Sequence, residues 1–315
     1  MVSELICSGL REEYFPLAAL AAYGLLQTCT EDLELPGCRL SWRRLPQWTA
    51  VIDLPEGIDT DQLLPLLAQS APQLRLSSPW RQLPVTFPQM LLEPFAAAFS
   101  DAAVNATADD RRRADALVAA GTDLVANSKK RVQASPLCMP QSGNSPWAKR
   151  VWELEDLLAH DAATAADLFR EAILGPWLYR EEQSSLGLDP STVRLHAYRA
   201  RNPVPEGTAH GVPGAIWLAL QAFVLFPCAC DRRHVETAAI AADVTHGTDA
   251  LLLPIWTDPI GLDTLRSLLS MVGGVDGRRR HDLTRRGVEA VFSSTRRPRE
   301  RGTYALAPSV MDSDE

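Results

Sequence analysis

Lysine is scarce in this sequence of 315 residues, and the short motifs of several enzyme classes are missing. Only Lys129, Lys130 and Lys149 are lysines, so 28 of the 31 basic residues are arginine. The sequence has no phosphate-binding loop that ends in Gly-Lys, no G-x-G-x-x-G segment and no H-E-x-x-H segment. These absences argue against a P-loop nucleotide site, a Rossmann-type dinucleotide site and the zinc helix of a metalloprotease.

Hydrophobic runs of membrane-spanning length are missing as well. Residues 212–230 carry no charge, but Pro213 and Pro227 bracket the run and leave roughly 13 helical residues, short of the ~18 that a spanning helix needs. The apolar run 15–30 follows acidic residues and lacks the basic segment that opens a signal peptide. We therefore expect a cytoplasmic protein that does not interact with a membrane.

Cysteine spacing gives no disulfide framework. The cysteines are Cys7, Cys29, Cys38, Cys138, Cys228 and Cys230. Cys228, Cys230 and His234 resemble half of a zinc site, but the single residue between the thiols is shorter than the usual gap. Buried reduced thiols are the favoured interpretation, and we expect neither a metal nor a cofactor.

Three histidines, His196, His210 and His246, are candidates for a general base. No carboxylate or nucleophile lies at a sequence distance that indicates a partner for them. The sequence therefore gives no reason to name a catalytic residue, although a composite site assembled from distant residues stays open.

The sequence does contain a dense arginine segment near its C-terminus. Residues 278–301 hold nine arginines against three acidic residues, a net charge of +6 in a chain of −8. The nine are Arg278, Arg279, Arg280, Arg285, Arg286, Arg296, Arg297, Arg299 and Arg301. Codon bias would raise the number of arginines but would not cluster them. The cluster predicts contact with a polyanion, and nucleic acid is favoured over an acidic protein surface.

A weaker basic cluster lies at Lys129 and Lys130, followed by Arg131. We expect these residues to close a helix, where the helix dipole alone accounts for cations. They are therefore secondary candidates for contact with nucleic acid.

A polar loop provides the other secondary candidates. Ser142 and Asn144 lie in this loop, with Lys149 and Arg150 just behind it, so these side chains could contact phosphate or sugar. The alternative is an ordinary surface turn that caps the next helix through Ser145.

Hydrophobic periodicity predicts an α+β fold, helix-rich in the N-terminal half and mixed helix and strand in the C-terminal half. The expected helices lie after Pro16, at 59–69, twice within 89–126 with a break near Asn105 and Thr107, and at 147–160, 162–174, 215–226 and 262–271. The expected strands lie at 39–42, 49–52, 192–201 and 251–256, and at 288–292 and 303–306, which would pair around an arginine-bearing turn. Prolines 72, 79, 84 and 88 predict an irregular connection.

The organisation along the chain follows from these elements. Residues 1–132 are expected to be mainly helical with short strands, 133–146 a polar loop, 147–308 a mixed α+β region and 309–315 a disordered tail. One continuous domain is the alternative.

Four blocks of short motifs carry a family resemblance. They are Gly9-Leu10, Pro16-Leu17, Leu20-Ala21 and Gly24-Leu25-Leu26; then Gly175-Pro176-Trp177, Ser185-Leu186 and Asp189-Pro190; then Leu225-Phe226-Pro227, Leu253-Pro254-Ile255-Trp256, Leu262-Asp263 and Arg266-Ser267-Leu268-Leu269; and finally Arg286-Gly287-Val288, Val291-Phe292 and Arg296. These blocks resemble accessory proteins encoded with CRISPR systems of the type I-G (I-U) group and the openings of some type I large subunits.

The resemblance implies a non-catalytic subunit or accessory of a Cascade-like ribonucleoprotein in antiviral defence. Its partners would be guide RNA or target DNA and other CRISPR effector subunits. Arginine loops would hold the nucleic-acid backbone while base pairing reads the sequence. Two alternatives stay open: a protein-interaction adaptor that binds no nucleic acid, and a hydrolase or nuclease with a composite histidine site.

Overall fold

A computed structural model of the chain describes residues 3–107, 111–139, 146–182, 184–190, 210–231, 234–243, 248–273, 282–298 and 304–311. The fold is α+β, as the sequence predicts. The helices are α1 (Leu17–Gln27), α2 (Thr60–Leu76), α3 (Leu92–Asn105), α4 (Arg112–Ala120), α5 (Trp147–His160), α6 (Ala162–Leu174), α7 (Pro213–Gln221) and α8 (Leu262–Val272), with short turns η1 (Glu12–Tyr14), η2 (Thr28–Asp32), η3 (Pro79–Gln82) and η5 (Ala222–Leu225). The strands are β1 (Ser3–Arg11), β2 (Arg39–Leu45), β3 (Gln47–Leu54), β4 (Gly121–Ala126), β5 (Val132–Ala134), β6 (Cys228–Asp231), β7 (His234–Thr237), β8 (Ile240–Asp243), β9 (Thr248–Trp256), β10 (Val288–Pro298), β11 (Tyr304–Leu306) and β12 (Val310–Met311).

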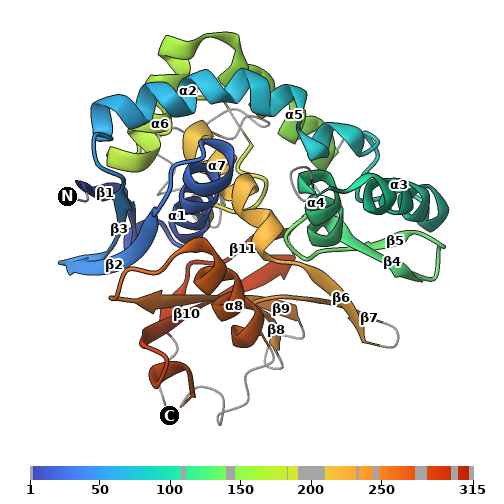
Figure 1. Cartoon of the computed structure of the whole chain (residues 1–315). Coiled ribbons are helices and arrows are strands. Elements are labelled where there is room, and N and C mark those ends of the chain that lie inside the picture. Colours follow the sequence, from blue (N-terminus) through green and yellow to red (C-terminus); the bar gives the residue numbers. More distant parts are fainter. Residues whose placement is uncertain are drawn as a thin grey trace.

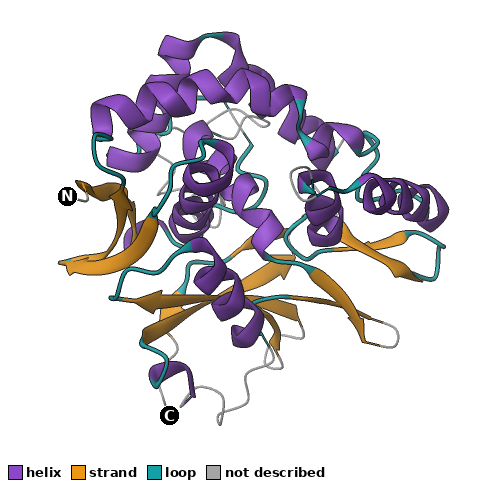
Figure 2. Cartoon of the chain, viewed as in Figure 1, coloured by secondary structure: helices purple, strands orange, loops and turns teal. Residues whose placement is uncertain are grey.

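Helices α1 and α7 occupy the centre, between an outer group formed by α2, α5 and α6 and the strands below (Figures 1 and 2). Every residue of both central helices is buried, because both are apolar on all sides. Gly24 allows their close approach, since a Cβ there would lie 1.7 Å from the carbonyl oxygen of Leu218. The predicted helix after Pro16 is confirmed, and the predicted helix 215–226 continues as the 3-10 turn η5 after Gln221.

Two antiparallel sheets lie against these helices. The first has the strand order β1-β3-β2, and the second has the order β11-β10-β9-β8, with β12 also paired to β10. Leu40 of β2 and Ile260 exchange backbone hydrogen bonds of 2.9 and 3.0 Å, which join the first sheet to the residues before α8. The predicted strands at 39–42, 49–52 and 251–256 are confirmed. Strand β10 does pair with β11, but through Arg296 to Pro298, which were expected in the turn, whereas the predicted strand 288–292 pairs with β9.

Local sequence signals set the ends of the outer helices. The Asp59 side chain accepts the N–H groups of Asp61 and Gln62, and the Gln62 side chain accepts the Asp59 N–H, so α2 starts with a capping box. Helices α5 and α6 have the predicted bounds, and Gly175, with φ of 63°, ends α6. Pro72, which was predicted to lie in an irregular connection, lies inside α2.

Other expectations differ from the structure. Residues 121–126, predicted as the end of an alanine-rich helix, form β4, because Gly121 ends α4 and the chain then pairs with β5. Val310–Met311, predicted to lie in a disordered tail, form β12 against β10. The predicted strand 192–201 lies outside the described residues.

The buried apolar side chains form a continuous cluster that runs from Leu5 to Leu306 in sequence. It includes side chains from both sheets and from the central and outer helices. Within the described ranges, no helix has the length and apolar character needed to cross a bilayer.

Candidate nucleic-acid interface

Strand β10 divides the arginine-rich C-terminal segment. Arg285 and Arg286 lie in the turn before the strand and are exposed, whereas Arg296 and Arg297 lie at its far end. With a rise of about 3.3 Å per residue, the two arginine pairs are roughly 30 Å apart. Arg278 to Arg280, Arg299 and Arg301 lie outside the described residues. The described arginines therefore form two separate sites and not one patch.

The two arginines at the far end of β10 differ in their surroundings. The Arg296 guanidinium lies 3.9 Å from the centroid of the Tyr304 ring, and its Nη1 is 3.1 Å from Asp249 Oδ2. These contacts attach β10 to β9 and β11 and partly neutralise the charge. Arg297 is exposed, and no acidic side chain of the described residues lies within ion-pair distance of it. Arg297 is the better placed of the two for a phosphate.

Lys129 and Lys130 do not close a helix, so that prediction is wrong. They lie in the turn between β4 and β5, which extends at the edge of the molecule (Figure 1). The Asn127 side chain accepts the N–H groups of Lys129 and Arg131 at 2.9 and 3.1 Å, and Lys130 has a φ of 56°. Because the side chain of Asn127 fixes this turn, the helix dipole no longer accounts for the two lysines.

The ammonium groups of this turn are available to a ligand. Lys129 and Lys130 are exposed, and neither is within ion-pair distance of an acidic side chain in the described part of the chain. The backbone oxygen of Lys130 accepts the Leu92 N–H at 3.0 Å, and the Val132 N–H donates to Met90 at 3.1 Å. The segment before α3 therefore supports the hairpin on its second side.

Lys149 and Arg150 begin α5 but share an acidic neighbour. Arg150 Nη1 is 2.9 Å from Glu153 Oε2, and Lys149 Nζ is 3.9 Å from Glu153 Oε1. Positive charge is unfavourable at a helix N-terminus, and Glu153 offsets it there. Ser142 and Asn144 lie outside the described residues. Lys149 and Arg150 are thus weaker candidates than the unpaired cations.

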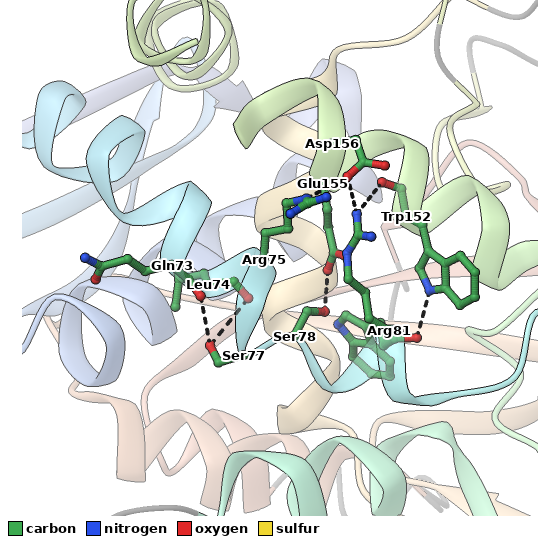
Figure 3. A network of polar contacts seen from close by, with 10 residues as sticks. Gln73, Leu74, Arg75, Ser77, Ser78, Arg81, Trp152, Glu155 and Asp156 are labelled. Carbon is green, nitrogen blue, oxygen red and sulfur yellow. Dashed lines mark hydrogen bonds and ion pairs between the residues drawn. The ribbon is translucent and has the colours of Figure 1, made fainter. Parts of the chain in front are cut away.

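Most other described arginines belong to internal ion pairs. Figure 3 shows the largest group, in which Arg81 Nε is 2.8 Å from Glu155 and Arg81 Nη2 is 2.6 Å from Asp156. Arg75 reaches the same Asp156 oxygen at 2.6 Å, and the Ser78 hydroxyl donates to Glu155. These contacts connect the end of α2 and η3 with α5, so these arginines stabilise the fold.

Glu155 is buried, with 3% of its side chain exposed. Burial raises its pKa to about 7, and the hydrogen bond from Ser78 and the charge of Arg81 oppose this rise only in part. Glu155 lines neither of two pockets found in the described part of the chain, and it is held by Ser78 and Arg81, so the arrangement fits a structural junction better than a catalytic acid.

A second internal pair lies where η2, α4 and α7 meet. Arg112 contacts Asp32 through Nη1 and the Gln221 side-chain oxygen at 2.5 Å through Nη2. Burial raises the pKa of Asp32 to about 6, although Arg112 acts in the opposite direction. This pair holds three helical elements together and leaves no free charge.

The other sequence candidates do not gather in the described structure. Cys228 and Cys230 lie on β6 and His234 on β7, and no group of three or more metal-binding side chains occurs in the described ranges. His196 and His246 lie outside those ranges, whereas His210 lies just before α7. The thiols of Cys7, Cys29, Cys38 and Cys138 are buried and free, as expected, whereas Cys228 and Cys230 are free but only partly buried.

The β2–β3 hairpin carries exposed cations that were not among the sites predicted from the sequence. Arg43 and Arg44 lie near its tip, and Trp48 lies on the return strand. Two adjacent arginines between tryptophans, in a stretch without an acidic residue, were the available signal. Searches of the chain against protein-family models, curated proteins and solved structures find no match.

Proposed function

We propose that this protein is a non-catalytic, nucleic-acid-contacting subunit or accessory of a type I CRISPR effector complex. The resemblance described from the sequence motivates the assignment to such a complex. The chemical part of the proposal depends on one observation, which is that the described cations fall into two classes.

The first class consists of arginines that are held by carboxylates, such as Arg75, Arg81 and Arg112. The second class consists of exposed cations with no acidic partner among the described residues. Its members at the candidate sites are Lys129, Lys130, Arg285, Arg286 and Arg297. A chain of net charge −8 has ample carboxylate to pair its cations, so unpaired cations at a hairpin tip and at both ends of β10 favour an external polyanion.

The proposed contacts are to phosphate and not to base edges. Lysine and arginine at separate, protruding positions can each neutralise one phosphate, and guide–target pairing would supply the sequence specificity. The footprint is narrow, because the rest of the chain is acidic on balance. This combination fits a subunit that adds a few contacts to a larger complex.

The salt dependence of binding tests the phosphate contacts. The slope of log K against log salt is negative, and each cation removed from a phosphate should make it shallower by about 0.7 for single strands and 0.9 for duplex DNA. We expect the double variant Lys129→Ala/Lys130→Ala to have a slope shallower by about 1.4 to 1.8, and the double variant Arg285→Ala/Arg286→Ala to show the same change. Fluorescence anisotropy with a labelled oligonucleotide, measured from low to moderate salt, gives the slope.

Arg111 provides a matched control. Its side chain is 69% exposed, but it is paired with Asp115 at 3.2 Å. Arg111→Ala should therefore leave the slope unchanged. Equal slopes for the wild type and both double variants would refute the phosphate contacts and leave the adaptor as the better hypothesis.

Purification from the native host tests the assignment to a complex. A tagged chain recovered at moderate salt should carry RNA of guide length together with other effector subunits. Recovery of the protein alone would contradict stable assembly.

A further inference from the structure

The tip of the β2–β3 hairpin, residues 43–48, has a composition unlike that of the rest of the first sheet. It contains Arg43, Arg44 and Trp48 and no acidic residue. Figure 1 shows this hairpin extending from the body on the side opposite the β4–β5 turn. Leu45, Pro46 and both arginines are exposed, while the preceding Trp42 is buried.

Trp48 differs from the other seven tryptophans of the chain. Six of them are buried, and half-buried Trp152 donates its indole N–H to the Trp80 oxygen at 3.0 Å. Trp48 is also half-buried, but among the described residues its ring contacts no other aromatic ring and its indole N–H has no hydrogen-bond partner. The indole packs against the core and stays partly exposed.

Arg44 lies directly opposite Trp48 in the β2–β3 register. Opposite residues of an antiparallel pair share a face, with their Cβ atoms about 5 Å apart. Arg44 has no acidic partner in the described part of the chain, and its guanidinium is not placed over the Trp48 ring. The Arg44 and Trp48 side chains thus share one face of the hairpin, and the guanidinium does not cover the ring.

The neighbouring charges leave Arg44 as the free cation of the tip. Arg43 Nη1 is 2.6 Å from Glu4 Oε1, so that charge is shared. A Glu12 oxygen accepts the backbone N–H of Trp48 at 3.3 Å and is thereby engaged on the main-chain side. Electrostatic attraction at the tip is therefore modest, and a ligand would depend mainly on contact with the indole.

We propose that this tip binds single-stranded nucleic acid, with one unstacked base on the Trp48 ring and an adjacent phosphate at Arg44; the inference rests on the proposed function. A base inside a duplex has both faces covered by its neighbours, so only a single strand can present one to the indole. Stacking on an aromatic side chain tolerates any base, and a neighbouring cation holds the backbone. The tip selects strandedness and not sequence.

The test compares a normal oligonucleotide with one that lacks bases. The full chain is titrated into a fluorescein-labelled oligouridylate of about 12 nucleotides, within the usual site size of single-strand binding proteins, and into an abasic ribose-phosphate chain of equal length. Trp48→Ala should weaken binding of the oligouridylate about 5- to 150-fold, which corresponds to the removal of one stacked base. Its binding of the abasic chain should not change.

Three further variants make the test specific. Trp48→Phe keeps an aromatic ring and should retain most of the affinity, even if the alanine variant fails to fold. Arg44→Ala should weaken the binding of both ligands and make the salt dependence shallower by about 0.7 in slope. Arg39 lies on the same strand away from the tip and is also exposed, so Arg39→Ala should leave the preference for bases over the abasic chain unchanged.

The outcomes separate this inference from the proposed function. Equal affinity of the wild type for the oligouridylate and the abasic chain, or unchanged affinities in Trp48→Ala, would overturn the stacking contact. If Lys129, Lys130, Arg285 and Arg286 still governed the salt slope in that case, the proposed function would stand. Absence of salt-dependent binding to every probe would overturn both.

Discussion

Substitution of Glu155 by glutamine should remove part of the pH dependence of stability. Glu155 is buried, accepts hydrogen bonds from Ser78 and Arg81, and has its pKa raised by burial from 4.5 to about 7. In the unfolded chain the carboxyl returns to its ordinary pKa. The folded chain therefore holds a proton between pH 4.5 and 7 that the unfolded chain releases.

The sign follows from this proton difference. The unfolded state binds fewer protons in that range, so the free energy of unfolding falls as pH rises from 4.5 to about 7 and changes no further above it. At about 1.36 kcal/mol per pKa unit, the full effect is about 3 kcal/mol, of which about 2.5 kcal/mol falls between pH 5 and pH 8. A glutamine cannot titrate, but its amide oxygen can still accept from Arg81 while its NH2 group donates to the Ser78 hydroxyl.

Urea unfolding at pH 5, 6, 7 and 8 measures the effect. The free energy of unfolding of the wild type minus that of Glu155→Gln should decrease by about 2.5 kcal/mol over this range. Glu153→Gln is the matched control, since this glutamate lies on the same helix but is 40% exposed. If the difference in free energy of unfolding between the wild type and Glu155→Gln stays constant from pH 5 to pH 8, burial does not raise the pKa of this carboxyl.

Three other substitutions test the packing and capping described above. Arg112→Ala should destabilise the protein by about 3 kcal/mol in urea unfolding at pH 7, because Asp32 then lies buried without its cation, and by less at pH 5, where Asp32 takes up a proton; equal destabilisation at both pH values would contradict this reason. Gly24→Ala should cost about 3 kcal/mol or prevent folding, because its methyl group would meet the Leu218 carbonyl, and a fully stable variant would show that α1 and α7 can separate freely. Asp59→Ala should lower the free energy of unfolding by about 1 kcal/mol by removing the α2 cap, whereas Asp59→Asn should retain most of it.

Local signals in the sequence predicted the elements whose stability is local. The capping box at Asp59 and the glycine after Leu174 mark helix ends through contacts within a few residues, and the structure places both ends there. The sequence also predicted that the last two strands would pair, because β10 and β11 are close in sequence.

The errors have two causes, a missed strand after α4 and ion pairs between residues far apart in sequence. Residues 121–126 were assigned to the alanine-rich helix that precedes them, but Gly121 ends α4 and the hairpin with β5 decides their conformation. The wrong placement of Lys129 and Lys130 at a helix end followed directly from that error. Composition also could not show which arginines are paired, because Arg81 and Arg112 reach acids more than 70 residues away.

The pairing of α1 with α7 has a consequence during synthesis. Helix α1 is apolar on every side, and about 185 residues separate its last residue from the first of α7. At 5 to 20 residues per second, a ribosome needs roughly 10 to 40 seconds to complete that interval. Throughout that interval the emerging chain exposes a helix whose main packing partner does not yet exist. Productive folding therefore waits for the second half of the chain, and a fragment that ends before α7 should aggregate unless a chaperone shields α1.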